Sequence, residues 1–245
     1  MTAKTVIVTG ASSGIGRDVA RAFVDRGDAV VLGGRDAAKL ADVAATLAAP
    51  DRVATVVGDI GSPATGAAYV RTALDRFGRV DTLINSAGVF GATPFVDVTE
   101  DELDRYLDGN LKGTYLTTQA VVRQLLARGG GGSIVNIGTV LIDHAMTGLP
   151  ASAALVSKGG VHALTTSLAA ELAPAGIRVN AVAPGIIRTP LFGDGDERAA
   201  ASLALLDRIG EVADTTAAVL YLADAEFVTG HILPVDGGFV AGRSA

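Results

Sequence analysis

Short runs of β-branched residues alternate along the chain with longer alanine-rich segments whose apolar residues recur at helical spacing. This alternation is typical of a parallel sheet with helices on both of its faces. The runs are apolar throughout, which indicates strands that are buried on both sides. We predict seven strands, at residues 5–9, 29–32, 53–57, 82–85, 133–137, 178–183 and 232–235.

Consecutive strands are separated by segments long enough to hold a crossover helix. We predict helices near residues 15–26, 37–48, 63–77, 100–128, 152–173 and 212–223. Because crossovers between parallel strands are right-handed, these elements give a doubly wound α/β fold with a seven-stranded parallel sheet.

The segment from about residue 186 to 210 departs from this alternation. It contains Pro190, a Gly-Asp-Gly-Asp stretch at 193–196 and a short helix rich in alanine and leucine. A long connection of this kind carries function more often than framework. We interpret it as a flap over the substrate, and an apolar acceptor is favoured by its side chains Leu191, Phe192, Leu203, Leu205 and Leu206.

The chain has 245 residues, no internal repeat and no linker, so we predict a single domain over residues 1–245. The net charge of -6 and the lack of a long basic run argue against a nucleic-acid partner. The absence of cysteine excludes disulfides and thiol nucleophiles, and no cluster of histidines or carboxylates indicates a metal site. The chain begins Met-Thr-Ala-Lys without a secretory signal and has no apolar run of bilayer length, so we expect a cytoplasmic protein without a membrane partner.

Three glycines lie where the first strand meets the first helix, in the stretch from Thr9 to Gly16. Glycines in this position let backbone N–H groups approach a diphosphate at the positive end of a helix. We therefore predict a dinucleotide site whose phosphate loop is formed by Gly10, Ser12, Ser13, Gly14, Ile15 and Gly16.

The end of the second strand indicates which dinucleotide is preferred. An acidic residue there holds the adenosine ribose hydroxyls of NAD, but this chain has Gly34 and Arg35. Glycine leaves room for a 2′-phosphate, and a guanidinium offers that phosphate a planar set of donors. We therefore predict NADP(H) in preference to NAD(H). Asp36 is better placed to cap the next helix than to reach the ribose.

Two more loops follow predicted strands, one after the third strand and one after the fourth. The carboxyl ends of parallel strands meet at one edge of a sheet, where α/β proteins bind their ligands. The cofactor site is therefore predicted to include Asp59, Ile60, Asn85, Ala87 and Gly88.

These motifs, with others further along, resemble the short-chain dehydrogenase/reductase family over essentially the full chain. The matching stretches are Thr9-Gly10-x-x-x-Gly14-x-Gly16, Asn85-Ser86-Ala87-Gly88, Asn110-Leu111-Lys112-Gly113, Val179-Asn180-Ala181-Val182-Ala183-Pro184-Gly185 and Asp236-Gly237-Gly238. The resemblance implies a Rossmann fold that binds NAD(P)(H) and transfers hydride to or from a small molecule. It also implies a homotetramer or dimer, and a nicotinamide that lies against Pro184, Gly185, Ile187 and Thr189.

The active site of that family combines an asparagine, a serine and a Tyr-x-x-x-Lys pair. Asn110 matches the asparagine, Thr139 stands at the serine position and keeps a hydroxyl, and Lys158 matches the lysine. Four residues before Lys158 the chain has Ala154, so the phenol is missing. The expected roles are a hydrogen bond from Thr139 to the acceptor, ribose binding by Lys158 and a bound water at Asn110.

Three functions are compatible with the missing phenol. A carbonyl reductase or alcohol dehydrogenase would take its proton from elsewhere, and Asp143 and His144 are candidate donors. An imine reductase needs no such acid, because an iminium ion is already protonated. A redox-inactive sensor or scaffold would bind NADP(H) without turnover. For His162 and His231 we expect structural roles.

Overall fold

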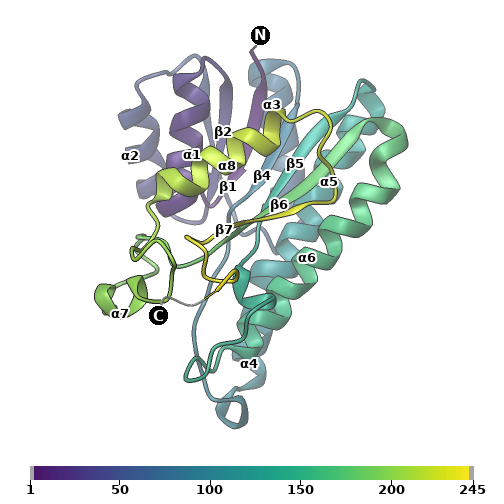
Figure 1. The fold of residues 1–245 in the computed structure, drawn as a ribbon. Helices are drawn as coiled ribbons and strands as arrows, with labels where there is room; N and C mark the ends of the chain where they lie inside the picture. The colour runs from purple at the N-terminus through teal and green to yellow at the C-terminus, as the bar shows by residue number, and fades with distance from the viewer. Residues whose placement is uncertain (1–2, 243–245) are drawn as a thin grey trace.

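The computed structural model describes residues 3–242. The predicted domain covers residues 1–245, so its first two and last three residues lie outside the described part of the chain. Seven parallel strands form one sheet in the order β3-β2-β1-β4-β5-β6-β7 (Figure 1). The strand order reverses between β1 and β4, which confirms the doubly wound α/β fold. The strands are β1 (Thr5–Thr9), β2 (Ala29–Gly34), β3 (Val53–Val57), β4 (Thr82–Asn85), β5 (Gly132–Ile137), β6 (Ile177–Pro184) and β7 (Ile232–Val235).

Helices cover both faces of the sheet. One face carries α1 (Gly14–Asp25), α2 (Ala37–Leu47) and α8 (Val212–Asp224), and the other carries α3 (Pro63–Phe77), α5 (Gly113–Arg128) and α6 (Ser152–Leu172) (Figure 1). The shorter helices are α4 (Glu100–Tyr106) and α7 (Glu197–Ala201), with single turns η1 (Phe95–Asp97), η3 (Val140–Ile142) and η4 (Ala173–Ala175) and a π-helical turn η2 (Leu107–Lys112).

Strand β1 shows why the strands are apolar throughout. Val6 and Val8 pack into the core on the side of α1, whereas Ile7 packs into the core on the side of α3, and all three side chains are fully buried. Successive side chains of a strand point to opposite faces, so a strand with helices on both faces needs an apolar residue at every position.

Strand β2 is longer than the sequence predicted. It continues to Gly34, because Gly33 and Gly34 pair with Val56 and Val57 of β3. Glycine weakens a strand on its own, and here the ladder with a β-branched neighbour decides the conformation.

The predicted helix at 100–128 is wrong as a single helix. It consists of α4 and α5 joined by the π-helical turn η2, and buried Asn110 lies on that turn. A π-helical turn adds one residue to a helix without changing the apolar periodicity enough to be visible in the sequence. It rotates the side chains that follow it and fixes the direction of Asn110.

The two ends of segment 186–210 lie next to each other, close to the end of β6. Ile187 and Gly210 form an isolated parallel bridge, and the N–H of Gly210 donates to the carbonyl of Ile186 over 2.8 Å. Farther out, the Arg188 guanidinium pairs with Glu197 of α7 and with Glu211 at the start of α8. The segment is therefore a closed loop held at its base by backbone bonds and across its width by ion pairs.

Candidate active site

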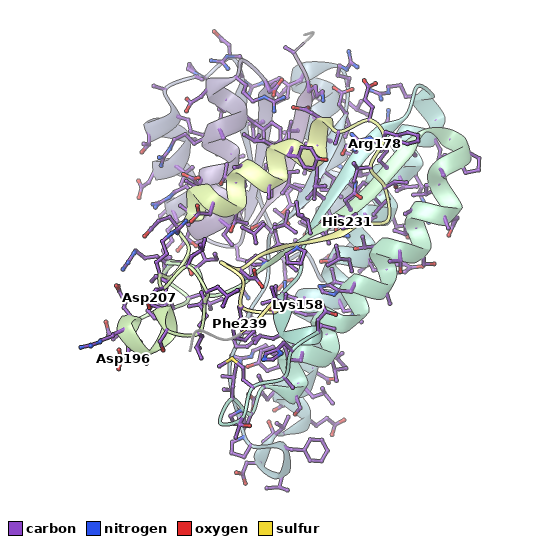
Figure 2. The ribbon with its side chains drawn as sticks, in the orientation of Figure 1. Lys158, Arg178, Asp196, Asp207, His231 and Phe239 are labelled. Carbon is purple, nitrogen blue, oxygen red and sulfur yellow. The ribbon has the colours of Figure 1, made fainter. Side chains whose placement is uncertain are left out.

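The carboxyl ends of the strands gather the predicted site residues at one edge of the sheet. Lys158 and Phe239 lie toward that edge in Figure 2, whereas Arg178, near the start of β6, lies toward the opposite one. The loops after β1 and β4 meet there, at the position where the strand order reverses. This is the position at which open α/β sheets bind ligands.

The glycine loop after β1 packs directly on the loop after β4. The Oγ1 atom of Thr9 accepts hydrogen bonds from the N–H groups of Ser86 and Ala87, both over 3.1 Å. A Cβ atom at Gly10 would lie only 2.7 Å from the Cα atom of Ala87, and the φ angle of 67° at Gly10 also favours glycine. A Cβ atom at Gly16 would overlap the carbonyl oxygen of Gly10. These contacts require glycine at both positions.

The N-terminus of α1 fits the diphosphate of a dinucleotide. Its N-cap residue Ser13 makes no side-chain capping bond, and its first turn contains no acidic residue. By contrast, Asp36 caps α2 and Thr99 caps α4 through their side-chain oxygens. The first N–H groups of a helix have no partner within the helix, so an uncapped N-terminus beside a tight glycine loop offers donors to an anion.

The end of β2 presents Arg35 on the surface, exposed and next to Gly34. Asp36 caps α2, as the sequence predicted: its Oδ1 atom accepts the N–H of Lys39 over 3.0 Å. That backbone hydrogen bond is the main cause that lowers the pKa of Asp36. The carboxylate of Asp36 is therefore engaged in the helix cap, and Arg35 is the exposed charged residue directly before it.

The predicted residues after β3 and β4 differ in what their side chains do. Asp59 is exposed at the end of β3 and accepts the N–H of Gly61, while Ile60 is buried. The side chain of Asn85 is turned into the protein, where its Nδ2 atom donates to Thr118 and to Asn136, each over 2.9 Å. The side chain of Asn85 thus links β4 to β5 and α5 by hydrogen bonds. Only the backbone of Asn85 is then available to a ligand at the edge of the sheet.

Lys158, Asn110 and Gly88 come together at this edge. The ammonium of Lys158 donates to the carbonyl of Ile137, at the end of β5, over 2.7 Å. A Cβ atom at Gly88 would lie 2.9 Å from Oδ1 of Asn110 and 3.2 Å from Nζ of Lys158, so the loop after β4 passes directly over both side chains. Burial lowers the pKa of Lys158 to about 8.

Asn110 is held by three hydrogen bonds. Its Oδ1 atom accepts the N–H of Val89 over 2.7 Å, and its Nδ2 atom donates to the carbonyl of Val89 and to Oγ of Ser157, both over 2.9 Å. Ser157 is fully buried and donates in turn to the carbonyl of Ala154. Ser157 was not among the site residues predicted from the sequence. Its position one residue before Lys158, on the inner face of α6, is the signal that could have indicated it.

Thr139 lies beside His162 of α6. The N–H of Thr139 donates to Nε2 of His162 over 3.4 Å, and a Cβ atom at Gly138 would overlap that ring. Burial lowers the pKa of His162, against the opposing effect of Asp143, and the charge of Lys158 lowers it further. His162 is therefore a neutral acceptor. This contact is consistent with the expected structural role of His162, and it involves a backbone partner that sequence alone did not indicate.

The two donors predicted after Thr139 differ in their surroundings. Asp143 is exposed, and His144 packs its ring edge against Phe239 at a centroid separation of 5.0 Å. His231 lies just before β7 and donates its N–H to Asn180, which is consistent with a structural role.

Ala154 is fully buried among apolar side chains. It clusters with Ala153 and Tyr106, and packed against these are Val89, Phe90, Val98 and Leu103. The hydroxyl of Tyr106 accepts a hydrogen bond from Arg105 and faces Glu102. The position four residues before Lys158 therefore has a hydrocarbon environment.

The residues after β6 approach the glycine loop. A Cβ atom at Gly14 would lie 3.5 Å from two side-chain atoms of Thr189, so the two segments are in near contact. Gly185 packs on Asp236, where a Cβ atom would lie 2.8 Å from the Cα atom. Pro184 ends β6 and Ile187 is buried at the base of the 186–210 loop. These four predicted residues thus frame one side of the same edge.

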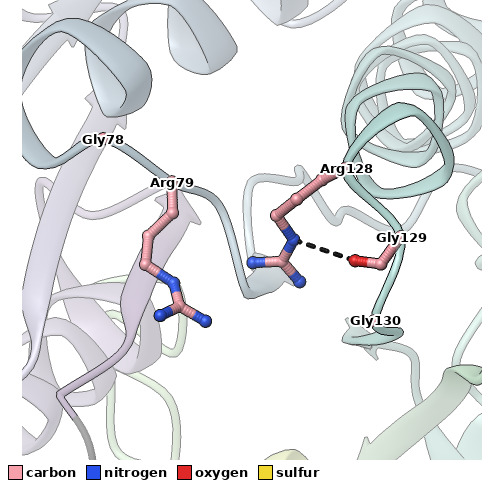
Figure 3. Close-up of a pocket in the computed structure, with 5 residues that line it drawn as sticks. All are labelled: Gly78, Arg79, Arg128, Gly129 and Gly130. Carbon is pink, nitrogen blue, oxygen red and sulfur yellow. Dashed lines mark hydrogen bonds between the residues drawn. The ribbon is translucent and has the colours of Figure 1, made fainter.

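A hollow of about 410 Å³ lies at the opposite edge of the sheet, between Arg79 and Arg128 (Figure 3). Both guanidiniums pair with Asp81, over 2.7 Å and 2.6 Å, and Arg128 also donates to the carbonyls of Gly129 and Gly131. These arginines hold strand ends together. Within residues 3–242 no group of three or more histidine or acidic side chains is arranged to hold a metal ion, and no helix is long and apolar enough to cross a membrane.

Comparisons with known proteins agree with this geometry. A family model described as enoyl-(acyl carrier protein) reductase matches residues 10–240. A short-chain type dehydrogenase/reductase from Mycobacterium marinum has the same fold, with a TM-score of 0.93 and 31% identity over 98% of this chain and 96% of that one. The chain belongs to the short-chain dehydrogenase/reductase family. Members of this family bind nicotinamide dinucleotides and act on small molecules.

Two further similarities cover nearly the whole chain. It is 38% identical to the (2S)-[(R)-hydroxy(phenyl)methyl]succinyl-CoA dehydrogenase subunit BbsD of Thauera aromatica, over 96% of each chain. The structure described as ElxO with NADP bound is similar with a TM-score of 0.91 and 26% identity, over 98% of this chain and 100% of that one.

Proposed function

We propose that the protein is an NADP(H)-dependent oxidoreductase that transfers hydride between the nicotinamide and a small, apolar carbonyl or alcohol substrate. The observation that carries the proposal is the convergence of Lys158, Asn110 and Gly88 at the sheet edge that also holds the glycine loop. When bound, the dinucleotide supplies or takes up the hydride. The protein supplies binding, orientation and proton transfer.

The residues have distinct proposed roles at this edge. The N–H groups of residues 12–16 bind the diphosphate, and Asp59 and the backbone around Ala87 bind the adenosine half. Pro184 and Thr189 hold the nicotinamide half together with Lys158. The hydroxyl of Thr139 orients the acceptor oxygen by a hydrogen bond.

The preference for NADP(H) rests on the end of β2. Asp36 is engaged in capping α2, and Arg35 is exposed beside a glycine, so a 2′-phosphate meets a guanidinium instead of a carboxylate. The NADP in the similar ElxO structure supports the same preference.

An apolar acceptor is supported by the side chains beyond Thr139. Val140, Ala183 and Phe239 form a buried cluster, and Met146 and Leu203 of the two flanking loops pack against it. This cluster joins the loop after β5, the 186–210 segment and the C-terminal segment, which are the three segments that surround the outer side of the site.

The direct test is binding followed by turnover. Calorimetry should detect NADPH with at least about tenfold higher affinity than NADH, a difference of one charge-assisted contact. A panel of apolar ketones and aldehydes should then oxidise NADPH. Binding of neither dinucleotide would refute the assignment, and equal affinities would refute the NADP preference.

A second function, imine reduction, is favoured by one observation. The position four residues before Lys158 is Ala154 in a hydrocarbon cluster, so no phenol is available to protonate an oxygen. An iminium carbon accepts hydride without needing an acid. Cyclic imines belong in the same assay panel, and turnover of imines without turnover of ketones would select this function. Tight NADPH binding with no turnover of either class would select the sensor or scaffold.

We also propose that the protein forms a homodimer or homotetramer. Tyr115 of α5 and Val156 of α6 are exposed, as are Tyr221 of α8 and Phe227 near the edge strand β7. Burying these side chains in a symmetric interface would stabilise a dimer or tetramer. Light scattering at micromolar concentration tests this, and a monomer would contradict it. A cytoplasmic location stays a prediction from sequence.

A further inference from the structure

The lysines of this chain are four in number, and one of them has a different environment from the rest. Three ammonium groups are paired with carboxylates, Lys4 with Asp224 at 2.6 Å, Lys39 with Asp36 at 3.7 Å and Lys112 with Asp108 at 3.0 Å. Within residues 3–242, Lys158 has no acidic partner, and its ammonium donates only to the carbonyl of Ile137. Its charge is therefore compensated by one dipole, while the other three are compensated by anions.

The ammonium of Lys158 lies at the end of β5, where the chain continues to Thr139, the residue proposed to orient the acceptor. It is close to Gly88 and Asn110, at the carboxyl ends of β4 and β5. Its hydrogen-bond partner Ile137 is followed directly by the corner formed by Gly138 and Thr139. An ammonium has three N–H donors, and the bond to Ile137 uses one of them. Two N–H donors therefore remain for groups at the site.

Two of the other proton-bearing groups around this position are engaged in hydrogen bonds. Ser157 donates to the carbonyl of Ala154, and the hydroxyl of Tyr106 faces Glu102. His162 uses Nε2 to accept the N–H of Thr139, whereas the ring of His144 contacts Phe239 and makes no hydrogen bond within the described residues, so His144 is the competing candidate. With Ala154 in place of a phenol, Lys158 is favoured because its ammonium binds the carbonyl of Ile137, two residues before Thr139.

We propose that Lys158 is itself the general acid of the reduction and the general base of the reverse oxidation, an inference that rests on the proposed carbonyl and alcohol activity. After hydride adds to the acceptor carbon, the negative charge lies on the acceptor oxygen. One N–H bond of the Lys158 ammonium breaks, and the proton forms the O–H bond of the alcohol. Lys158 is left as a neutral amine, which regains a proton from water before the next reduction.

Burial supports this role, because it lowers the pKa of Lys158 to about 8 and makes both protonation states accessible near neutral pH. The titratable group that interacts electrostatically with Lys158 is His162 on its own helix, and Asp143 after η3 acts on His162. Reduction needs the ammonium, so its rate should fall as pH rises through this pKa. Oxidation needs the amine, so its rate should rise through the same pH.

The first experiment needs no substrate or cofactor. Reductive methylation with ¹³C-formaldehyde gives four lysine resonances, and the spectrum of Lys158→Arg assigns the one that disappears. We expect the resonance of Lys158 to titrate near pH 8 in the free protein. An ordinary lysine titrates at about 10.4. Titration in the ordinary lysine range would overturn the proposal even if the enzyme is active.

The second experiment compares Lys158→Arg with Lys112→Arg, a matched change at an exposed, ion-paired lysine. Arginine stays charged, so Lys158→Arg should still bind NADPH while losing at least about 100-fold in kcat, as expected for loss of a general acid. Its residual rate should no longer fall at high pH. Lys112→Arg should keep the wild-type rate and pH profile.

Two further outcomes are decisive. If Lys158→Arg retains the wild-type profile, or if turnover disappears in His144→Gln but persists in Lys158→Arg, Lys158 is not the acid although the proposed function stands. If the wild-type protein binds NADPH and turns over no carbonyl or alcohol, the proposed function fails and this inference fails with it.

Discussion

The backbone N–H of Thr139 donates to Nε2 of His162, which links the corner after β5 to the helix that carries Lys158. The imidazole also fills the space beside Gly138, where any Cβ atom would overlap it. The position of the Thr139 hydroxyl thus depends on a histidine that lies outside the set of residues expected to touch substrate.

Gly138→Ala should destabilise the protein by about 1–3 kcal/mol, the usual cost of overpacking a filled site. Truncating the ring relieves the overlap, so Gly138→Ala combined with His162→Ala should be less destabilised than the sum of the two single variants. Urea unfolding of the wild type, the two single variants and the double variant measures this. Additive free energies of unfolding would show that the two positions do not interact.

The cofactor preference should be reversible at the end of β2. A Cβ atom at Gly34 would meet Leu40 carbons at 3.4–3.5 Å, which is ordinary contact, so an aspartate fits there. Gly34→Asp should weaken NADPH binding by repelling the 2′-phosphate, and should strengthen NADH binding through the ribose hydroxyls. Arg35→Ala should weaken NADPH binding by about 10- to 100-fold and leave NADH binding unchanged.

Calorimetry with both dinucleotides measures these changes. The charge control for Arg35→Ala is Arg17→Ala, which removes an exposed arginine on the outer side of α1. If Arg35→Ala affects both dinucleotides equally, its guanidinium acts by a general field and does not recognise the phosphate.

Asp81 should stabilise the edge of the sheet opposite the site. Burial acts to raise its pKa, but hydrogen bonds from Arg79, Arg128 and the N–H of Thr5 outweigh burial, and the net pKa lies below the ordinary 3.8. Asp81→Asn should cost about 2–4 kcal/mol, because two arginines lose a partly buried counter-ion. Asp224→Asn is the control, and this more exposed partner of Lys4 and Arg26 should cost less than about 1 kcal/mol.

The pH dependence of Asp81 has a definite sign. Because its pKa is lowered in the folded state, its stabilisation is fully present above the unfolded pKa near about 4 and is lost as pH falls through the folded value. The difference in unfolding free energy between wild type and Asp81→Asn should thus be constant from pH 7 to about 5 and shrink below about 4. A constant difference down to pH 2 would contradict the ionic role.

Asn110→Asp should test the three hydrogen bonds of Asn110 without changing its shape. The variant keeps an acceptor for the N–H of Val89, but places a carboxylate oxygen against the Val89 carbonyl and Ser157. We expect a loss of about 1–3 kcal/mol, because one carboxylate oxygen faces the Val89 carbonyl without a donor, and attraction to the nearby Lys158 ammonium offsets part of the cost. Chemical denaturation of the wild type and the variant at pH 8 measures this, and equal stability would show that the hydrogen bond to the Val89 carbonyl contributes nothing.

Most of the fold was predictable because each buried strand needs an apolar residue at every position, and the predicted bounds of β1, β3, β4 and β7 match the structure. The errors occurred where tertiary contacts decide. Gly33 and Gly34 are strand residues only because β3 pairs with them. The π-helical turn at Leu107–Lys112 leaves the helical pattern around it intact, so local periodicity did not reveal it.

The position of the candidate site residues in the fold was predictable where the backbone itself is constrained, at the glycine loop and the loops after β3 and β4, and their roles stay predictions. It was not predictable where side chains far apart in sequence share a hydrogen bond, as for Asn110 with Ser157 and Thr139 with His162. Such pairs depend on how α6 lies against the sheet, which no short stretch of sequence specifies.

Because of the π-helical turn, the structure of this part of the chain depends more on the number of residues between Leu107 and Lys112 than on their identity. An α-helix turns by about 100° per residue, so deleting one residue between Leu107 and Lys112 would restore an ordinary helix and rotate everything before it by that angle relative to α5. Tyr106 would leave its apolar cluster, and Asn110 would turn away from Val89. Engineered variants of this chain should therefore tolerate substitutions at the exposed positions of this turn, but not the insertion or deletion of a residue within it.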